Sequence, residues 1–432
     1  MANAILRVMQ VYGAWLSGRE LSEQEVYEAS SLLGTPTRKV DAFVERYNAV
    51  MAKLIEERCA EAAGGRMCIY TWSRRAYKRY FPAALDAGGT VLFFRGAEEV
   101  ELVSYPLHRA LDLGVRGVEL PGGDPVAVTP RLDGWQVNLY YDPVLKRWTF
   151  STRYVLHNMR FEGGRLVVED YGKVINPLVE TAERLSQRLQ LRSKLEQLRG
   201  WTLTLMLVGP EPATALRSLP DPDFYEDYKL VLLAARRPDG RLVEPYSEEL
   251  GRMAAELGLE SIASRALRGL SRDSAVEMAE RGLEAPSAFL WYTGDPEHPP
   301  YYEVKSSFYV EYIEATRRMD GKALVVLLTS GDERVAAKLE EELGPIVGEA
   351  REALRDLEEA LASAQPEAVE KSLRELGFNR RVSAEAARAL KEGKALRALR
   401  VVAANLAQGI GVGEVAEVLR SAAGRIRGLA AE

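Results

Sequence analysis

The stretch TPRLDGWQVNLYYD, residues 129–142, joins a polar turn to a segment in which apolar and polar residues alternate. Such alternation is typical of a half-buried strand, and Asp-Gly is a common turn in front of one. Similar short runs rich in β-branched and aromatic residues occupy 90–96, 100–107, 147–155, 165–172, 201–209, 228–237, 287–294 and 301–310. Helical stretches interrupt them at 174–199 and 246–281. This mixture predicts an α+β fold with mostly antiparallel sheets.

The residues outside this region have a helical pattern. We divide the chain into a helical N-terminal region (1–64), a mixed central domain (65–330) and a helical C-terminal domain (331–432). These boundaries follow the change in hydrophobic period from two to about 3.6 residues. They predict one sheet-containing domain between two helical regions.

The N-terminal region carries recognisable helix boundaries. Ser22 and Glu25 predict a capping box, and Gly34 predicts the end of that helix. Thr35 and Pro36 then predict the start of a second helix, whose apolar face extends to Ile55. The pattern favours a helical bundle or dimerisation element. A DNA-reading pair of helices is the alternative.

Composition limits the classes of function. The 432 residues carry a net charge of −6, so nucleic-acid binding requires a local basic patch. Two cysteines and three histidines are too few for a disulfide framework or a metal-ligand cluster. No signal peptide or membrane span is expected, and a reducing cytoplasm is the expected compartment. Few Asn and Gln among many Glu, Arg and Leu are typical of a thermophile.

The C-terminal domain contains the sharpest charge contrast in the chain. Residues 331–370 carry twelve acidic and four basic side chains, whereas 371–400 carry nine basic and three acidic ones. A solvated helix surface explains this contrast, and an RNA-backbone contact is the alternative. The residues that would make the RNA contact are Arg380, Arg381, Arg388, Lys391, Lys394 and Arg397.

Several motifs of the central domain, taken in order, resemble those of ATP-dependent RNA ligases of the phage and archaeal type. The matching stretches are FFRGAEEVELVSYPLHRALDLG, RLDG, FSTRYVLHN, LTLMLVGPE, YKLVLLAARRPDGRLVEPY, SAFLWYTGD and YYEVKSSFYVEY. The resemblance covers roughly residues 91–312. It implies a nucleotidyltransferase (ATP-grasp-like ligase) core of antiparallel sheets with helices.

The resemblance also implies a catalytic lysine, and this chain has another residue at that position. Ligases of this family attack the α-phosphate of ATP with the lysine of Lys-x-Asp-Gly, and RLDG places Arg131 there. A guanidinium stays protonated and can bind phosphate in a fork, but it is a poor nucleophile. We therefore expect no intact catalytic residue and no self-adenylylation.

Other motif positions also lack the residues that the family uses for catalysis. Met206 and the pair Pro286–Ser287 stand where carboxylates for the ribose or a divalent metal belong. Glu303 replaces the first lysine of Lys-x-Lys, where a negative charge would repel a triphosphate. No metal site is expected. The residues that could still bind a nucleotide or phosphate are Arg95, Arg131, Asp133, Gly134, Arg153 and Lys305.

These substitutions lead to three functional hypotheses. The first is a pseudo-ligase that binds RNA, either tRNA or single-stranded, or a protein partner. The second is a ligase active only on pre-adenylylated RNA ends. The third is a non-catalytic scaffold or regulatory subunit, as a homodimer or with an active ligase. No cofactor is certain, and ATP or AMP with Mg²⁺ is the one to test.

Overall fold

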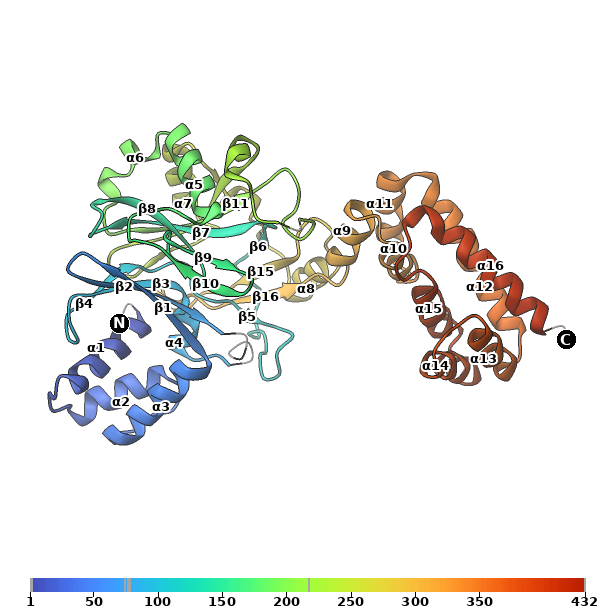
Figure 1. The fold of residues 1–432 in the computed structure, drawn as a ribbon, viewed down its shortest axis with the longest axis horizontal. Coiled ribbons are helices and arrows are strands. Elements are labelled where there is room, and N and C mark those ends of the chain that lie inside the picture. The colour runs from blue at the N-terminus through green and yellow to red at the C-terminus, as the bar shows by residue number, and fades with distance from the viewer. Residues whose placement is uncertain (1–2, 74, 76–78, 217, 431–432) are drawn as a thin grey trace. The chain divides into compact units, whose positions relative to one another are not determined.

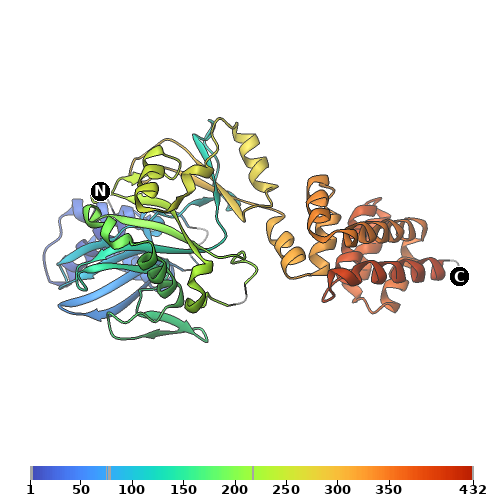
Figure 2. The same cartoon turned by 90° about the horizontal axis from the view of Figure 1, so that it is seen from above.

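The computed structural model describes residues 3–73, 75, 79–216 and 218–430 of the chain. Two compact units are present (Figures 1 and 2). The first contains residues 1–279 and 287–305, and the second contains 280–286 and 306–432. The N-terminal helices thus share a unit with the sheets, and the second unit begins before residue 331.

The first unit opens with three helices followed by an antiparallel sheet. The helices are α1 (Ala4–Leu16), α2 (Glu23–Leu32) and α3 (Val40–Lys53). The sheet has the order β1-β2-β3-β4, with β1 (Ile55–Ala62), β2 (Gly65–Trp72), β3 (Gly88–Phe94) and β4 (Val100–Ser104). The short helix α4 (Pro82–Asp86) precedes β3.

Three local predictions for this part can be compared with the structure. The Ser22–Glu25 capping box of α2 is confirmed. The predicted start of α3 at Thr35–Pro36 is wrong, because the helix begins at Val40. The predicted helix across 55–64 is also wrong. Glutamate, arginine and alanine favour a helix there, but pairing with β2 makes the segment a strand.

The cysteines also differ from expectation. Cys59 and Cys68 face each other across β1 and β2 and form a disulfide. Two cysteines cannot form a framework of several bridges, but the hairpin brings this one pair together. The count alone did not reveal that proximity.

A second sheet forms the centre of the first unit. Its order is β13-β12-β11-β7-β8, from β7 (Trp135–Asp142), β8 (Arg147–Thr152), β11 (Thr202–Val208), β12 (Lys229–Arg236) and β13 (Leu242–Val243). The neighbours on this path are antiparallel, while β14 (Glu260–Ser261) pairs with β12 in parallel. The associated helices are α5 (Pro177–Arg188), α6 (Leu191–Lys194) and α7 (Glu248–Leu257), with 3-10 turns Glu196–Leu198, Pro222–Asp227 and Ile262–Arg265.

These elements stack in layers because strand residues alternate between faces. On β2, Cys68 and Tyr70 belong to a core shared with α1–α3, while Met67 and Ile69 belong to one shared with Tyr140 of β7. The other face of the central sheet packs against α5 and α7. Figure 1 accordingly shows helices outside two facing sheets.

A buried carboxylate connects the N-terminal helices to the sheets. Asp86 accepts a hydrogen bond from the backbone N–H of Ala4 at 2.7 Å and another from the Tyr105 hydroxyl at 2.9 Å. His298 Nε2 also lies 2.9 Å from this carboxylate. Asp86 therefore holds together three segments that are distant in sequence.

A third sheet and a hairpin complete the first unit. The sheet has the order β5-β16-β15-β6, with β5 (Leu111–Asp112), β6 (Ala127–Arg131), β15 (Ser287–Trp291) and β16 (Tyr301–Lys305). The hairpin pairs β9 (Met159–Glu162) with β10 (Arg165–Val168). Helix α8 (Arg272–Glu280) lies before β15 in the chain.

The second unit is helical throughout its described part. It comprises α9 (Tyr309–Arg317), α10 (Gly321–Leu328), α11 (Glu333–Leu343), α12 (Pro345–Ser363), α13 (Pro366–Glu375), α14 (Arg380–Lys391), α15 (Ala395–Leu406), a 3-10 turn (Val412–Glu414) and α16 (Val415–Ala430). Helix α12 packs along α16.

The predicted α+β class, with mostly antiparallel sheets and helices, is confirmed. Within the described ranges, no helix combines the length and apolar character that crossing a membrane requires.

Candidate phosphate-binding pocket

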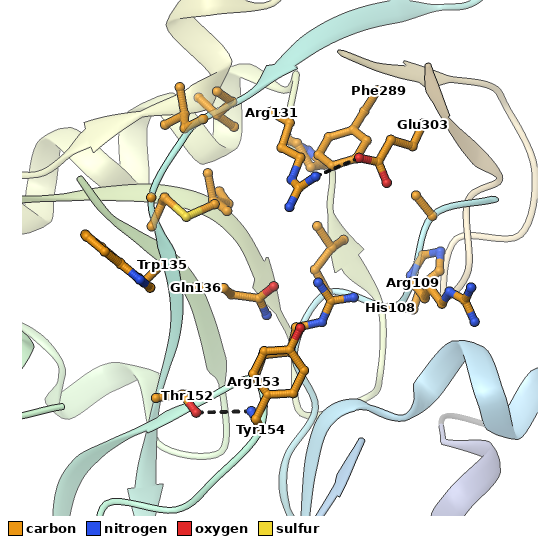
Figure 3. Close-up of a pocket in the computed structure, with 18 of the residues that line it drawn as sticks. His108, Arg109, Arg131, Trp135, Gln136, Thr152, Arg153, Tyr154, Phe289 and Glu303 are labelled. Atoms are coloured by element: carbon orange, nitrogen blue, oxygen red, sulfur yellow. Dashed lines mark hydrogen bonds and ion pairs between the residues drawn. The ribbon is translucent and has the colours of Figure 1, made fainter. Parts of the chain in front are cut away.

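A cavity of about 660 Å³ lies in the first unit, where strands of all three sheets contribute to its walls (Figure 3). Its charged lining consists of Arg109, Asp112, Arg131, Arg153, Arg160, Glu303 and Lys305. Five cations thus face two carboxylates, and His108 is kept neutral because burial lowers its pKa well below the usual value. The cavity therefore favours an anionic ligand.

Arg131 and Glu303 meet in this cavity although 172 residues separate them. Strand β15 lies between β6 and β16, so the ends that carry these side chains are neighbours. Arg131 Nη1 donates to Glu303 Oε1 at 2.9 Å (Figure 3). The Ser287 hydroxyl donates to the same oxygen at 2.8 Å. The residue at the expected nucleophile position is therefore held by a carboxylate.

A second ion pair occupies the same sheet. Lys305 Nζ lies 2.5 Å from Asp112 Oδ2, and the Asp112 side chain is almost fully buried. Nearby, Met206 lines the cavity from β11 where the resemblance implied a carboxylate. The lysine retained from the Lys-x-Lys motif is thus partly neutralised, and the thioether offers no metal-binding oxygen.

Arg153 is held differently from the other two cations. It follows β8, and its guanidinium carbon lies 3.5 Å from the centre of the Trp72 ring. Among the described residues, no carboxylate lies within 4.0 Å of its guanidinium. Burial, reinforced by the charge of Arg131, lowers the pKa of Arg153 to about 10, so the group remains cationic at neutral pH. It therefore keeps donors available for an anion.

Arg109 adds a second guanidinium to the same aromatic wall. Its guanidinium carbon lies 4.9 Å from the Trp72 ring centre and 4.8 Å from that of Tyr80. Burial lowers its pKa as well. Stacking on aromatic faces orients guanidinium groups.

The other residues predicted from the resemblance lie partly inside and partly outside the cavity. Gly134 lines the cavity, and a Cβ there would lie 2.5 Å from the Leu207 carbonyl oxygen, so close contact with β11 requires glycine. Asp133 accepts from the Thr214 backbone N–H at 3.2 Å. Arg95 lies outside the cavity, where it pairs with Glu101 at 3.1 Å. The structure thus brings Arg131, Gly134, Arg153 and Lys305 together, without Arg95.

The six basic residues predicted to contact RNA are all exposed in the second unit. Three of them form ion pairs: Lys391 with Glu367, Lys394 with Glu392 and Arg397 with Glu385. Within the described part of the chain, Arg380, Arg381 and Arg388 have no carboxylate within 4.0 Å. These three arginines belong to α14 and are the more available cations.

The aromatic residues of the pocket were only partly anticipated. Alternation along WQVNLYYD and RWTF favours core positions for Trp135, Tyr140 and Trp148; Tyr140 and Trp148 are buried, whereas Trp135 lines the cavity. Trp72 and Arg109 were missed, because Trp72 lies outside the matching stretches and nothing within FFRGAEEVELVSYPLHRALDLG distinguished Arg109. Their signal would have been the aromatic strand ending CIYTW and the basic pair in PLHRAL.

The residues present do not fit a divalent metal. Both carboxylates of the charged lining, Asp112 and Glu303, are bonded to cations. The one group of candidate ligands found among the described residues is Glu57 with Cys59 and Cys68, whose sulfurs are joined to each other. A phosphate without a metal fits the cationic lining better than Mg²⁺–ATP does.

Comparison with known proteins gives similar structures but no family assignment. No protein-family model matches the chain, and no curated protein matches it significantly. An archaeal ATP-dependent RNA ligase is 15% identical with a TM-score of 0.39, covering 88% of this chain and 77% of that one. A putative ATP-dependent DNA ligase from Aquifex aeolicus is 15% identical with a TM-score of 0.38, covering 70% and 76%.

A variant of the Naegleria gruberi RNA ligase, with AMP and Mn, is also similar. It is 10% identical with a TM-score of 0.30, covering 60% of this chain and 97% of that one. All three TM-scores are below 0.5. Function is therefore inferred from the residues of the pocket.

Proposed function

We propose that this chain is a ligase-like protein that binds the phosphorylated end of an RNA and does not form a covalent adenylate. The observation that carries the proposal is the ion pair between Arg131 and Glu303. A ligase of this type needs an amine with an accessible lone pair at the nucleophile position. Arg131 offers a delocalised cation instead, and Glu303 holds it.

The remaining pocket chemistry supports binding of an anion. Arg153 has no carboxylate partner among the described residues, and Arg109 lies on the same Trp72 ring. A terminal phosphate offers several acceptor oxygens to such guanidinium groups. In this proposal Arg153 makes the main phosphate contact, while Arg131 and Lys305 contribute charge that their carboxylate partners reduce.

The decisive test is incubation with α-labelled ATP and Mg²⁺ or Mn²⁺, followed by denaturing electrophoresis beside an active ligase. We expect no labelled band from the wild-type protein or from Arg131→Lys, because Met206, Ser287 and Glu303 still differ from the motifs. A covalent label on the wild-type protein would overturn the proposal and indicate another lysine as nucleophile.

The same preparation distinguishes the two other hypotheses. Joining of a pre-adenylylated RNA to a 3′-hydroxyl would establish sealing without self-adenylylation. Binding of a 5′-phosphorylated RNA in preference to its 5′-hydroxyl counterpart, without joining, would support the pseudo-ligase. The scaffold hypothesis instead requires a partner, and mass measurement in solution with and without RNA would reveal a homodimer.

The exposed arginines of α14 supply a second, independent contact in this proposal. Arg380, Arg381 and Arg388 would bind the RNA backbone without reading its end. Contacts of this kind add affinity that depends on salt but not on sequence.

A further inference from the structure

Two exposed aromatic rings line the mouth of the pocket. Tyr154 and Phe161 are each 48% exposed, although both contribute to the cavity wall. Tyr154 follows Arg153 directly, and Phe161 lies on β9 of the two-stranded hairpin. Exposed large apolar side chains at a cavity rim indicate a surface that contacts a ligand.

The turn that carries Tyr154 is fixed by hydrogen bonds. The Thr152 hydroxyl oxygen accepts from the backbone N–H of Tyr154 at 3.1 Å (Figure 3). It also accepts from the backbone N–H of Val155 at 3.0 Å. Val155 is buried. The turn therefore anchors its apolar end in the core while Tyr154 remains exposed, which reduces the entropy lost when a ligand binds the ring.

Arg58 of β1 links the two aromatic residues. It donates through Nη1 to the Tyr154 carbonyl oxygen at 2.5 Å, and its guanidinium carbon lies 5.0 Å from the centre of the Phe161 ring. Burial lowers the pKa of Arg58, and its charge is shared with Glu56. Arg58 thus positions the rings more than it attracts a ligand.

We infer that Tyr154 and Phe161 form a stacking platform for the unpaired bases of single-stranded RNA beside the phosphate pocket. The inference rests on the proposed function, because the pocket supplies the attraction for a polyanion. Nucleobases stack on aromatic rings whatever their identity, so the platform is expected to be tolerant of sequence. Bases inside a duplex are already stacked, and such a platform therefore favours single strands.

The charges around the rings favour RNA over an apolar peptide. The neighbouring pocket has five cations and two carboxylates, and Arg153 follows β8 immediately before Tyr154. A strand with its terminal phosphate at Arg153 would place its first unpaired bases near the rim. The occupant we expect is thus the 5′-phosphorylated end of a single-stranded RNA.

The test measures fluorescence anisotropy of RNAs of about ten nucleotides labelled at the 3′ end. The probes are a 5′-phosphorylated strand, its 5′-hydroxyl counterpart and a blunt duplex of the same sequence. We expect Tyr154→Ala and Phe161→Ala each to weaken single-strand binding at least about fivefold. Tyr154→Phe and Phe161→Tyr, which keep the rings, should bind within about twofold of the wild-type protein.

Tyr27→Ala is the matched control. Tyr27 is 43% exposed on α2 with Arg38 5.8 Å from its ring centre, and it lies outside the cavity lining. This variant should bind as the wild-type protein does. Circular dichroism of every variant establishes that the fold is intact.

The outcomes separate the platform from the phosphate pocket. Removing either ring should weaken binding of both single-stranded probes and leave the preference for a 5′-phosphate unchanged. If that preference persists while both alanine variants bind normally, the platform is overturned and the proposed function stands. The wild-type protein could show no preference for a 5′-phosphate while both alanine variants bind single strands more weakly. In that case the proposed phosphate recognition is overturned and the platform stands. Equal binding of the duplex and the single strand also overturns the platform.

Discussion

The pocket of the first unit and helices α14–α15 of the second are both rich in basic side chains, but they are built differently. The pocket gathers its cations from strands and turns that are far apart in sequence. The helices take theirs from one stretch of 30 residues, 371–400, and half of the predicted contact residues are paired with glutamates.

The difference concerns specificity. Arginines fixed against Trp72 present their donors in a defined geometry and suit a single phosphate group. Exposed helical arginines offer charge without fixed geometry and suit a polyanion of any sequence. We therefore expect the pocket to recognise the end of an RNA and the helices to add affinity along its backbone.

The largest expected effect is that of Arg153→Ala. Removing a charged donor group that has no carboxylate partner among the described residues should weaken binding of 5′-phosphorylated RNA about 10- to 100-fold. Binding of the 5′-hydroxyl RNA should change little, and titration by anisotropy measures both. Arg95→Ala is the control, because Arg95 is an exposed arginine that lies outside the cavity. Equal losses for the two probes would contradict specific recognition of the end.

A smaller effect is expected from reversing charge on α14. Changing Arg380, Arg381 and Arg388 together to Glu should weaken RNA binding about tenfold at low salt, with or without a 5′-phosphate. Affinity measured over a series of salt concentrations should give a shallower slope than the wild-type protein.

The paired residues of the same helices provide the control for that variant. Neutralising Lys391, Lys394 and Arg397 to Gln should have less effect, because their glutamate partners already offset the charge. If the two triple variants weaken RNA binding equally, the paired and unpaired cations contribute alike, and ion pairing does not determine which of them bind RNA. Unchanged binding in both would remove the second unit from the RNA contact.

The smallest expected effect is a gain in affinity for 5′-phosphorylated RNA. Glu303→Gln removes one of two carboxylates from the charged lining and releases Arg131. Affinity for the 5′-phosphorylated RNA should rise about threefold, since a nearby negative charge no longer opposes the phosphate. Glu101→Gln, which releases Arg95 outside the cavity, should cause no gain. A decrease in affinity for Glu303→Gln would indicate that the ion pair positions Arg131 for the ligand.

The local sequence pattern predicted many of the helices and strands but not which strands pair with each other. The alternation in WQVNLYYD identified β7, and the Ser22–Glu25 spacing identified the start of α2. The strand at 55–62 was missed because its Glu, Arg and Ala residues favour a helix. Its partner β2 and the disulfide decide its conformation, and neither is visible in a short window of sequence.

The sequence alone predicted the site only as a set of positions at which this chain departs from the ligase motifs. Motif order located Arg131 and Glu303 individually, yet nothing in their local sequence indicated that they would bond to each other across 172 residues. Arg95 shows the same limit: its motif resembles the family's, but the turn between β3 and β4 places it outside the cavity. Long-range strand pairing, which spacing does not encode, decides both cases.

The contacts of Asp86 bear on how this protein can be shortened. Its carboxylate accepts from Ala4 in a buried hydrogen bond and lies beside the partly buried His298. A truncated protein that begins after α3 would lose one of these partners and expose the apolar face of β2 to solvent. The first helices are therefore poor candidates for removal, and an expressed fragment designed to isolate the pocket should retain them together with β16.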